Sequence, residues 1–185
     1  MKFKRFSLLF LCLCCFLSVA ATGTPAEVPS VAVKCGSVGN FFKVSDELYR
    51  SAQPSGEEWT ALAAMGIKSV INLRLFGGGH DAVGNSGIKT YYLRWNAGSI
   101  SENDLVELLK LVKQAPKPVL IHCFHGSDRT GAAVAAYRVV FQNWTPADAA
   151  DELVNGGFGH HRIYFNIPRL IRKADWKQIK LKLQN

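Results

Sequence analysis

The stretch from Pro118 to Gly131 constrains the fold of this chain most, because it passes from a strand to a helix through a short turn. Pro118-Val119-Leu120-Ile121 is typical of a buried strand, and apolar residues recur at helical spacing from Thr130 to Gln142. Residues 123–129 must then form the turn. A tight turn that leads into a helix points successive N–H groups inward at the positive end of the helix dipole. The sequence therefore predicts an anion-binding nest at this turn.

The turn also holds a cysteine and an arginine six positions apart. Cys123 is expected at the floor of the nest, where the donors and Arg129 favour its thiolate and make it a nucleophile. The planar guanidinium of Arg129 can hold two phosphate oxygens and keep holding them in the transition state. Gly126 permits the tight turn, and the Thr130 hydroxyl can hydrogen-bond the sulfur when it departs as a thiolate. The residues expected to bind phosphate are Phe124, His125, Gly126, Ser127, Asp128 and Arg129.

This order of residues resembles the signature loop of the cysteine-dependent protein tyrosine phosphatase superfamily, and in particular its small dual-specificity branch. The motif is His122-Cys123, five residues, then Arg129-Thr130-Gly131. Three further segments resemble bacterial, often exported, members of that branch: Phe42 to Pro54, Gly66 to Arg74 and Gly156-Gly157-Phe158-Gly159. The resemblance covers residues 41–173 and implies a phosphomonoester hydrolase that uses a cysteinyl-phosphate intermediate. It implies a tyrosine or dual-specificity protein phosphatase that needs no metal or other cofactor.

Two other functions stay open, together with a purely structural interpretation. The substrate can instead be an inositol phosphate or phosphoinositide, because some lipid phosphatases of the superfamily also carry an aspartate, here Asp128, directly before the arginine. A non-catalytic phosphate-binding module is the third hypothesis. In the structural interpretation Cys123 is a buried core residue and His122 a packed histidine.

The sequence motif does not identify the general acid, the residue that protonates the leaving oxygen. Members of the family generally use an aspartate on the loop before the preceding helix, and here that loop, residues 94–100, contains no carboxylate. Glu102 and Asp104 come next but fall in the first turn of the expected helix, where capping and the helix dipole explain them. Asp128 is the other candidate, either as the acid or as a side chain that caps the loop or pairs with a base. A phenolic leaving group needs protonation less than an alkoxide does, which favours phosphotyrosine-like esters.

Alternating strand and helix patterns predict an α/β fold, a three-layer sandwich with a mostly parallel central sheet flanked by helices. Ser55, Ser101 and Thr145-Pro146 are the expected helix starts. Strands are expected at 41–44, 48–50, 67–73, 88–93 and 118–121, and helices at 55–65, 101–112, 130–142 and 145–155. Residues 166–175 and a basic terminal helix complete the chain.

The first 20 residues have the pattern of a secretory signal peptide: a basic start, an apolar run from Phe6 to Ala20 and small residues for cleavage. The run is short for a bilayer crossing, so an uncleaved anchor is the less favoured alternative. Its removal lowers the formal charge from +8 to +5, because three of the basic residues leave with it. We expect an exported protein, periplasmic or secreted, with a loose lead-in at 21–40 and one phosphatase domain at 41–185.

Seven basic residues and one acidic residue, Asp175, fall between Arg162 and Lys182. A solvated helical face explains this excess, and attraction of anionic substrates or of an anionic membrane surface is the alternative. No motif indicates nucleic-acid binding, and the oligomeric state does not follow from the sequence. His160-His161 is a lone pair without metal-ligand spacing. Cys35 and Cys123 remain after signal removal, and a reversible disulfide between them is a hypothesis.

Overall fold

The computed structural model describes residues 28–77, 83–84 and 86–184. The expected signal peptide therefore lies outside the described residues, as does part of the glycine-rich loop at 76–87. Within the described ranges no helix is both long enough and apolar enough to cross a membrane.

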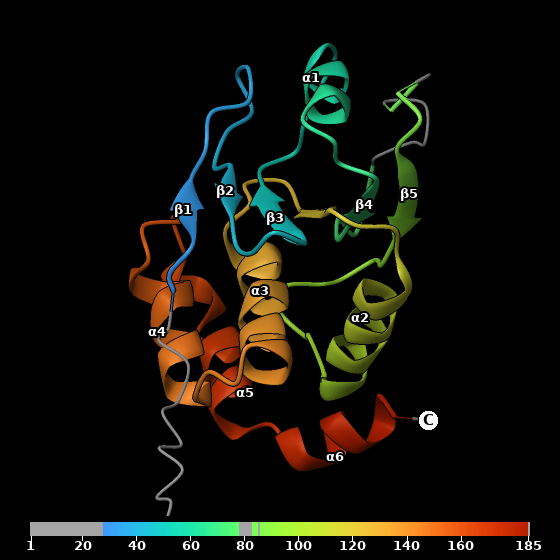
Figure 1. The fold of residues 1–185 in the computed structure, drawn as a ribbon. Helices are drawn as coiled ribbons and strands as arrows, with labels where there is room; N and C mark the ends of the chain where they lie inside the picture. The colour runs from blue at the N-terminus through green and yellow to red at the C-terminus, as the bar shows by residue number, and fades with distance from the viewer. Residues whose placement is uncertain (1–27, 78–82, 85, 185) are drawn as a thin grey trace, which may run out of the picture.

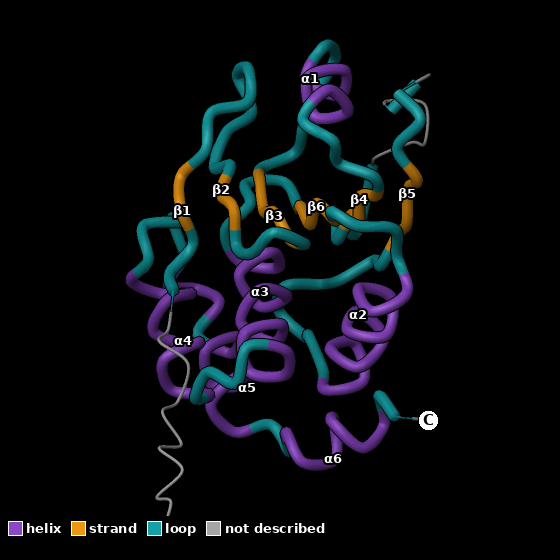
Figure 2. The backbone as a smooth tube through the Cα atoms, in the orientation of Figure 1, coloured by secondary structure: helices purple, strands orange, loops and turns teal. Residues whose placement is uncertain are grey.

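A six-stranded sheet forms the centre of the fold, in the order β1-β2-β3-β6-β4-β5 (Figures 1 and 2). Strands β3, β6, β4 and β5 are parallel to one another, while β2 pairs with β3, and β1 with β2, in the antiparallel sense. This confirms the predicted mostly parallel sheet. The strands are β1 (Val31–Ala32), β2 (Phe42–Lys43), β3 (Leu48–Ser51), β4 (Ser69–Asn72), β5 (Lys89–Tyr92) and β6 (Val119–His122).

Helices cover both faces of the sheet, as the predicted sandwich requires. In Figure 1, α1 lies on one side of the sheet and the other five helices lie on the opposite side. The helices are α1 (Glu58–Ala64), α2 (Glu102–Gln114), α3 (Asp128–Phe141), α4 (Pro146–Asn155), α5 (Asn166–Lys173) and α6 (Trp176–Lys182), with a 3₁₀ turn at Arg162–Tyr164.

The central strand β6 divides its side chains between two apolar cores. Val119, Ile121 and Cys123 belong to the larger core beneath α2–α6, whereas Leu120 belongs to the smaller core beneath α1. Alternation along a strand explains this division. It places the side chain of Cys123 on the face of the sheet that carries α3.

Two of the three predicted helix caps are confirmed. Ser101 forms a capping box with Asp104, and the hydroxyl of Thr145 accepts a hydrogen bond from the Asp148 amide. The Ser55 cap is wrong: α1 begins at Glu58, and the Glu58 carboxylate accepts a hydrogen bond from the Ser55 amide at 2.7 Å. Gly56 has φ +45°, a left-handed conformation that no continuous α-helix starting at Ser55 can contain.

Residues 28–40 differ from the loose lead-in predicted for them. Val31–Ala32 form strand β1, and Ser30 donates hydrogen bonds to Glu152 from its amide and its hydroxyl. Cys35 is buried in the smaller core. The sequence signal was weak because a two-residue edge strand shows no periodicity.

A buried ion pair joins α3 to α4 beneath this N-terminal segment. Arg138 is fully buried, and its Nε and Nη2 donate to the two Glu152 oxygens at 2.9 and 2.7 Å. Burial alone would raise the pKa of Glu152, but hydrogen bonds and charge from Arg138, together with Ser30, outweigh it and lower the pKa. Arg138 also lies 4.3 Å from the centroid of the Trp144 ring.

We predict that Glu152→Gln lowers the free energy of unfolding by about 3–5 kcal/mol at neutral pH, because it leaves Arg138 buried without its counter-charge. Since folding lowers the pKa of Glu152, this stabilisation is fully present above the unfolded-state pKa and is lost as pH falls through the folded-state pKa. Urea denaturation of wild type and variant at pH 7 and at low pH measures the difference. The exposed Glu107→Gln is the control, and an equal loss in both variants would contradict the role of the ion pair.

Candidate active site

The turn after β6 lies at the carboxyl end of the central parallel strand. Its residues 123–129 are called the signature loop below. Helix α3 starts at Asp128 rather than at the predicted Thr130, so Asp128 and Arg129 belong to the first helical turn. The free amides of that turn and the positive end of the helix dipole therefore lie next to the loop.

The carbonyl groups of the signature loop are tied outward to the scaffold. Phe124 O accepts from the Gln53 amide at 3.0 Å, His125 O from Asn40 Nδ2 at 2.9 Å, and Gly126 O from Arg50 Nη2 at 2.8 Å. In a trans peptide the carbonyl and the next N–H point in opposite directions. The amides that follow these three carbonyls therefore point away from the scaffold, in the direction that the nest prediction requires; they belong to His125, Gly126 and Ser127.

Gly126 lets the loop lie against the end of β3. It has φ +74°, and a Cβ at this position would lie 2.6 Å from backbone atoms of Ser51 and Ala52. Both the conformation and the close approach exclude a side chain. The glycine predicted for a tight turn is thus also required for contact between the loop and β3.

Cys123 is 2% exposed and lies at the base of the signature loop. It shares the larger core with Val119 and Ile121, so its burial alone would also suit a structural cysteine. What distinguishes it is charge, because the buried guanidinium of Arg50 interacts electrostatically with it. A thiolate at this position faces a cation and the loop rather than apolar side chains alone.

Arg50 is a functional candidate that sequence reasoning missed, since it appeared there only as part of a matching segment. Its side chain is buried, stacks 3.7 Å from the centroid of the Phe158 ring and donates to Gly126 O. Burial lowers the pKa of Arg50 to about 10, against the opposing charges of Glu152 and Cys123. It therefore stays protonated at neutral pH. An arginine within a short, otherwise buried strand was the signal available in the sequence.

His122 precedes the cysteine and is fully enclosed. Its Nδ1 lies 3.0 Å from Cys123 O, and burial lowers its pKa to about 4. The neutral ring donates to that carbonyl and packs against Trp59. This geometry matches the packed histidine of the structural interpretation, and the ring also fixes the carbonyl at the start of the loop.

Arg129 and Thr130 follow in the first turns of α3. The Nε of Arg129 and the Oγ1 of Thr130 are buried and, among the described residues, make no hydrogen bond. Buried polar groups normally have partners. Both side chains thus keep bonding capacity next to the signature loop, as expected if Arg129 binds a phosphate and Thr130 bonds the sulfur of Cys123.

Asp128 is held by two histidines. Its Oδ2 accepts from His161 Nδ1 at 2.7 Å, its Oδ1 accepts from the His161 amide at 2.9 Å, and His160 Nδ1 lies 3.0 Å from Oδ1. Of the two alternatives for Asp128, pairing with a base describes these contacts. The sequence analysis gave His160-His161 no role, and nothing in the sequence linked them to a residue more than 30 positions away.

Further hydrogen bonds join the Gly156–His161 segment to the signature loop. Ser127 Oγ donates to Phe158 O at 2.7 Å, and Asn40 Nδ2 bridges Phe158 O and His125 O. The segment Gly156-Gly157-Phe158-Gly159, one of those that resemble the dual-specificity branch, therefore lies against the signature loop.

The loop at residues 94–100 is well packed without a carboxylate. Trp95, Ala97 and Ile100 are buried, and Asn166 Nδ2 donates to Ala97 O at 2.9 Å. The two carboxylates that follow have other partners. Asp104 closes the capping box with Ser101, and Glu102 Oε1 accepts from the Asp175 amide at 3.0 Å.

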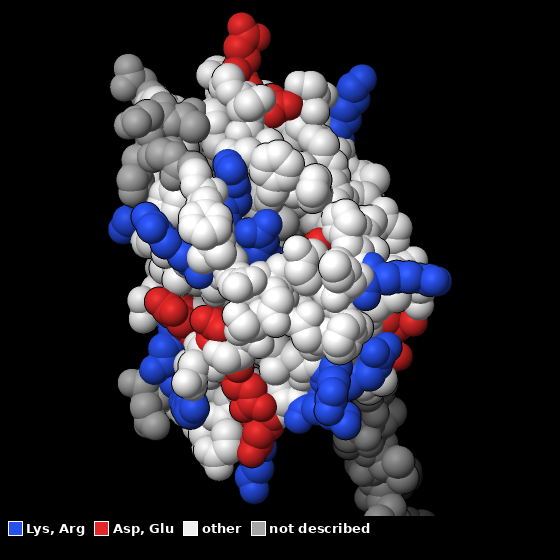
Figure 3. All heavy atoms as spheres, turned by 180° about the vertical axis from the view of Figure 1, so that it is seen from behind, with Lys and Arg blue, Asp and Glu red and all other residues white. Residues whose placement is uncertain are grey.

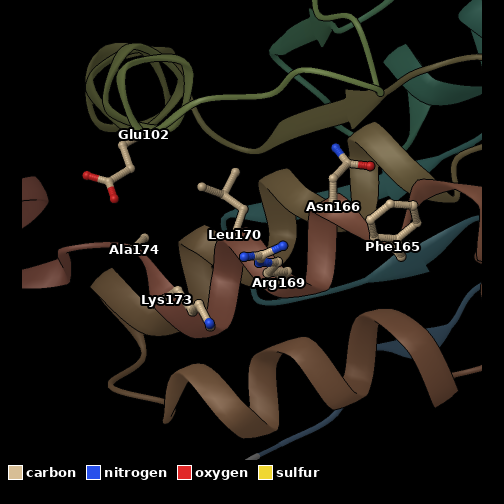
Figure 4. Close-up of a pocket in the computed structure, with 7 residues that line it drawn as sticks. All are labelled: Glu102, Phe165, Asn166, Arg169, Leu170, Lys173 and Ala174. Carbon is tan, nitrogen blue, oxygen red and sulfur yellow. The ribbon is translucent and has the colours of Figure 1, made fainter.

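A surface pocket of about 260 Å³ lies between the start of α2 and α5 (Figure 4). No residue of the signature loop lines it, and the Glu102 carboxylate at its edge is the one that binds the Asp175 amide. We therefore do not place the chemistry there. Its lining residues are Glu102, Phe165, Asn166, Arg169, Leu170, Lys173 and Ala174.

The charged residues do not form one continuous patch on the face shown in Figure 3, where Lys and Arg lie in separate groups between Asp and Glu. The seven basic residues counted between Arg162 and Lys182 are all exposed. Exposure of all seven is compatible both with a solvated face and with attraction of an anionic partner.

Cys35 and Cys123 are both free and lie in the two different cores, on opposite faces of the sheet. A disulfide needs Cα atoms within about 7 Å and facing side chains. The hypothesised pair does not meet that requirement in this fold. Burial, followed by the charge of Glu58, raises the pKa of Cys35, which makes it a less reactive thiol.

Comparison with known proteins agrees with this geometry. The dual specificity protein phosphatase TpbA of Pseudomonas aeruginosa strain PAO1 is 29% identical over 168 residues, which cover 90% of this chain and 75% of TpbA. A crystal structure of a cysteine-to-serine variant of P. aeruginosa TpbA in complex with phosphotyrosine superposes with a TM-score of 0.76 at 28% identity, covering 88% of this chain and 99% of that one. The inositol diphosphatase DSP5 of Arabidopsis thaliana is 30% identical over 122 residues, covering 61% of this chain and 59% of DSP5.

Residues 37–164 match the model of the tyrosine phosphatase family, and this range contains the signature loop and the Gly156–His161 segment. The chain belongs to the tyrosine phosphatase family.

Proposed function

We propose that this chain is a phosphomonoester hydrolase of the tyrosine and dual-specificity type, with Cys123 as the nucleophile. One observation carries the proposal: Cys123 lies at the base of a loop whose carbonyls are tied outward, so that its amides turn inward beside Arg129. This arrangement suits a dianionic group bound above a nucleophilic sulfur.

In the first step the Cys123 thiolate attacks phosphorus, and the bond between phosphorus and the ester oxygen breaks. The inward amides of the signature loop and the guanidinium of Arg129 hold the remaining phosphate oxygens as charge redistributes. Arg50 lies beneath the loop and donates to Gly126 O, which holds the loop in place during the attack.

In the second step water attacks the cysteinyl-phosphate, and the bond between phosphorus and sulfur breaks. The Thr130 hydroxyl has no other hydrogen-bond partner among the described residues and can donate to the departing thiolate. Asp128 takes part in proton transfer, because Glu102 and Asp104 are engaged elsewhere and residues 94–100 offer no carboxylate.

A phosphotyrosine-like ester is the substrate that we favour. The phosphotyrosine complex of TpbA supports it, and a phenolate leaving group suits a site without the usual acid. An inositol phosphate or diphosphate is the second candidate, supported by the identity to DSP5 over a shorter region. We also propose that the protein is exported, on the basis of the signal pattern at residues 1–20.

We predict that the mature protein hydrolyses an aryl phosphate in the presence of EDTA and that Cys123→Ser lowers kcat by at least about 10⁴-fold, because the nucleophile is lost. Binding of phosphotyrosine, measured by calorimetry, should survive in the variant. Binding by the wild type without turnover would instead support the non-catalytic module. A panel that includes inositol phosphates separates the two substrate classes.

We predict that Gly126→Ala lowers kcat/KM by about 10²-fold or more, because its Cβ displaces the signature loop from Ser51 and Ala52. Gly66→Ala is the matched control, since Gly66 also has a positive φ but a Cβ there meets nothing within 4 Å. The control should lose about 1–2 kcal/mol of stability with little change in kcat/KM. Equal effects on kcat/KM would mean that loop contact is not the cause.

A further inference from the structure

The Asp128–His161 pair has the connectivity of a proton-transfer dyad. One oxygen of the buried Asp128 carboxylate accepts a hydrogen bond from Nδ1 of His161 at 2.7 Å. The other oxygen accepts a hydrogen bond from the His161 amide. A carboxylate that orients Nδ1–H leaves Nε2 as the nitrogen that exchanges protons, as in hydrolases that pair aspartate with histidine. This chain lacks a carboxylate on the loop where its family generally carries the acid.

We propose that His161 is the catalytic residue that exchanges protons with the substrate, and that Asp128 acts through it as a positioning residue. The proposal rests on the function proposed above and supplies its missing acid. The two residues come from different elements, Asp128 from the first turn of α3 and His161 from the end of the Gly156–His161 segment.

The position of His161 agrees with this role. Its side chain is 48% exposed, so the side of the ring opposite Asp128 is accessible. The ring centroid lies 5.3 Å from that of His125, a residue of the signature loop. Because the Gly156–His161 segment is bonded to the loop through Ser127 and Asn40, His161 is held at the rim of the site.

His160 contacts the same carboxylate but cannot take the role. Its Nδ1 lies 3.0 Å from Asp128 Oδ1 but is not aligned for a hydrogen bond, so the carboxylate does not orient its ring as it orients that of His161. Its side chain is also 5% exposed, against 48% for His161. His160 therefore confines the carboxylate, while the His161 ring stays partly open to solvent.

Four titratable groups face His161: Asp128 from α3, His160 beside it, His125 from the signature loop and Tyr164 from the 3₁₀ turn, whose ring centroid lies 6.4 Å away. Asp128 is the carboxylic acid of this set, and it contacts the ring directly at Nδ1. With Nδ1 engaged by the carboxylate, Nε2 is the ring nitrogen from which a proton can move to the leaving oxygen.

As the bond from Cys123 Sγ to phosphorus forms and the ester bond breaks, the proton on Nε2 moves to the leaving oxygen, which departs as an alcohol or phenol. Neutral His161 then accepts a proton from water as the water oxygen bonds to phosphorus and the phosphorus–sulfur bond breaks. His161 is again an imidazolium, and Cys123 is again a thiolate.

The test is His161→Asn, because the asparagine amide can keep the donor to Asp128 but has no group in place of Nε2. We would measure kcat/KM for phenyl phosphate and for 4-nitrophenyl phosphate, whose leaving group needs no proton. We expect a loss of about 10²-fold or more for phenyl phosphate and a much smaller loss for 4-nitrophenyl phosphate. The alkaline limb of the pH profile for phenyl phosphate should disappear.

Arg162→Gln is the control, since Arg162 is the exposed neighbour of His161. It should preserve the ratio of the two kcat/KM values. Asp128→Asn is a second variant, because it removes the carboxylate that orients the His161 ring, and we expect it to show the same selectivity for the leaving group. The double variant should then lose little more than either single variant.

Equal losses on both phosphates, with folding intact by thermal melting, would make His161 a purely structural residue and overturn the proposal. No loss on phenyl phosphate would overturn it as well. If His161→Asn fails to fold, Asp128→Asn becomes the deciding variant. Equal losses of kcat/KM on the two phosphates in Asp128→Asn would then overturn the proposal. Absence of turnover in the wild type would reject the proposed function itself, a result distinct from turnover that is insensitive to His161.

Discussion

The outward hydrogen bonds of the signature loop are the interactions on which the rest of the site depends. A loop that binds an anion must turn its amides inward, and the peptide plane then turns its carbonyls outward. Here Gln53, Asn40 and Arg50 donate hydrogen bonds to those carbonyls. Three residues between positions 40 and 53, N-terminal to the loop, thus hold it in place.

The buried charges of the fold are arranged around the same loop. Arg50 lies beneath it, stacked on Phe158, and Arg138 with Glu152 joins α3 to α4 behind it. Each guanidinium is compensated by hydrogen bonds or by an aromatic face, as burial of a cation requires. Because α3 begins in the signature loop, whatever fixes α3 also fixes the position of Arg129.

Several parts of this arrangement could be predicted from residues close together in the chain. The strand, turn and helix around Cys123 followed from local pattern, as did the caps at Ser101 and Thr145. The predicted start of α1 was wrong, because Gly56 is left-handed and interrupts the helix expected to begin at Ser55. Contacts across long separations, such as Asp128 with His161, left no local pattern from which to predict them.

The sequence by itself determined the fold class and the placing of Cys123 and Arg129 in one turn, because both depend on patterns within short stretches of the chain. Cys123 and Arg129 must share one turn whatever the rest of the chain does. Only the tertiary structure decided that Arg50 supports the loop from below and that His160 and His161 hold Asp128. Those partners meet because the sheet and helices bring distant segments together, and burial then makes each contact between charged or polar groups strong.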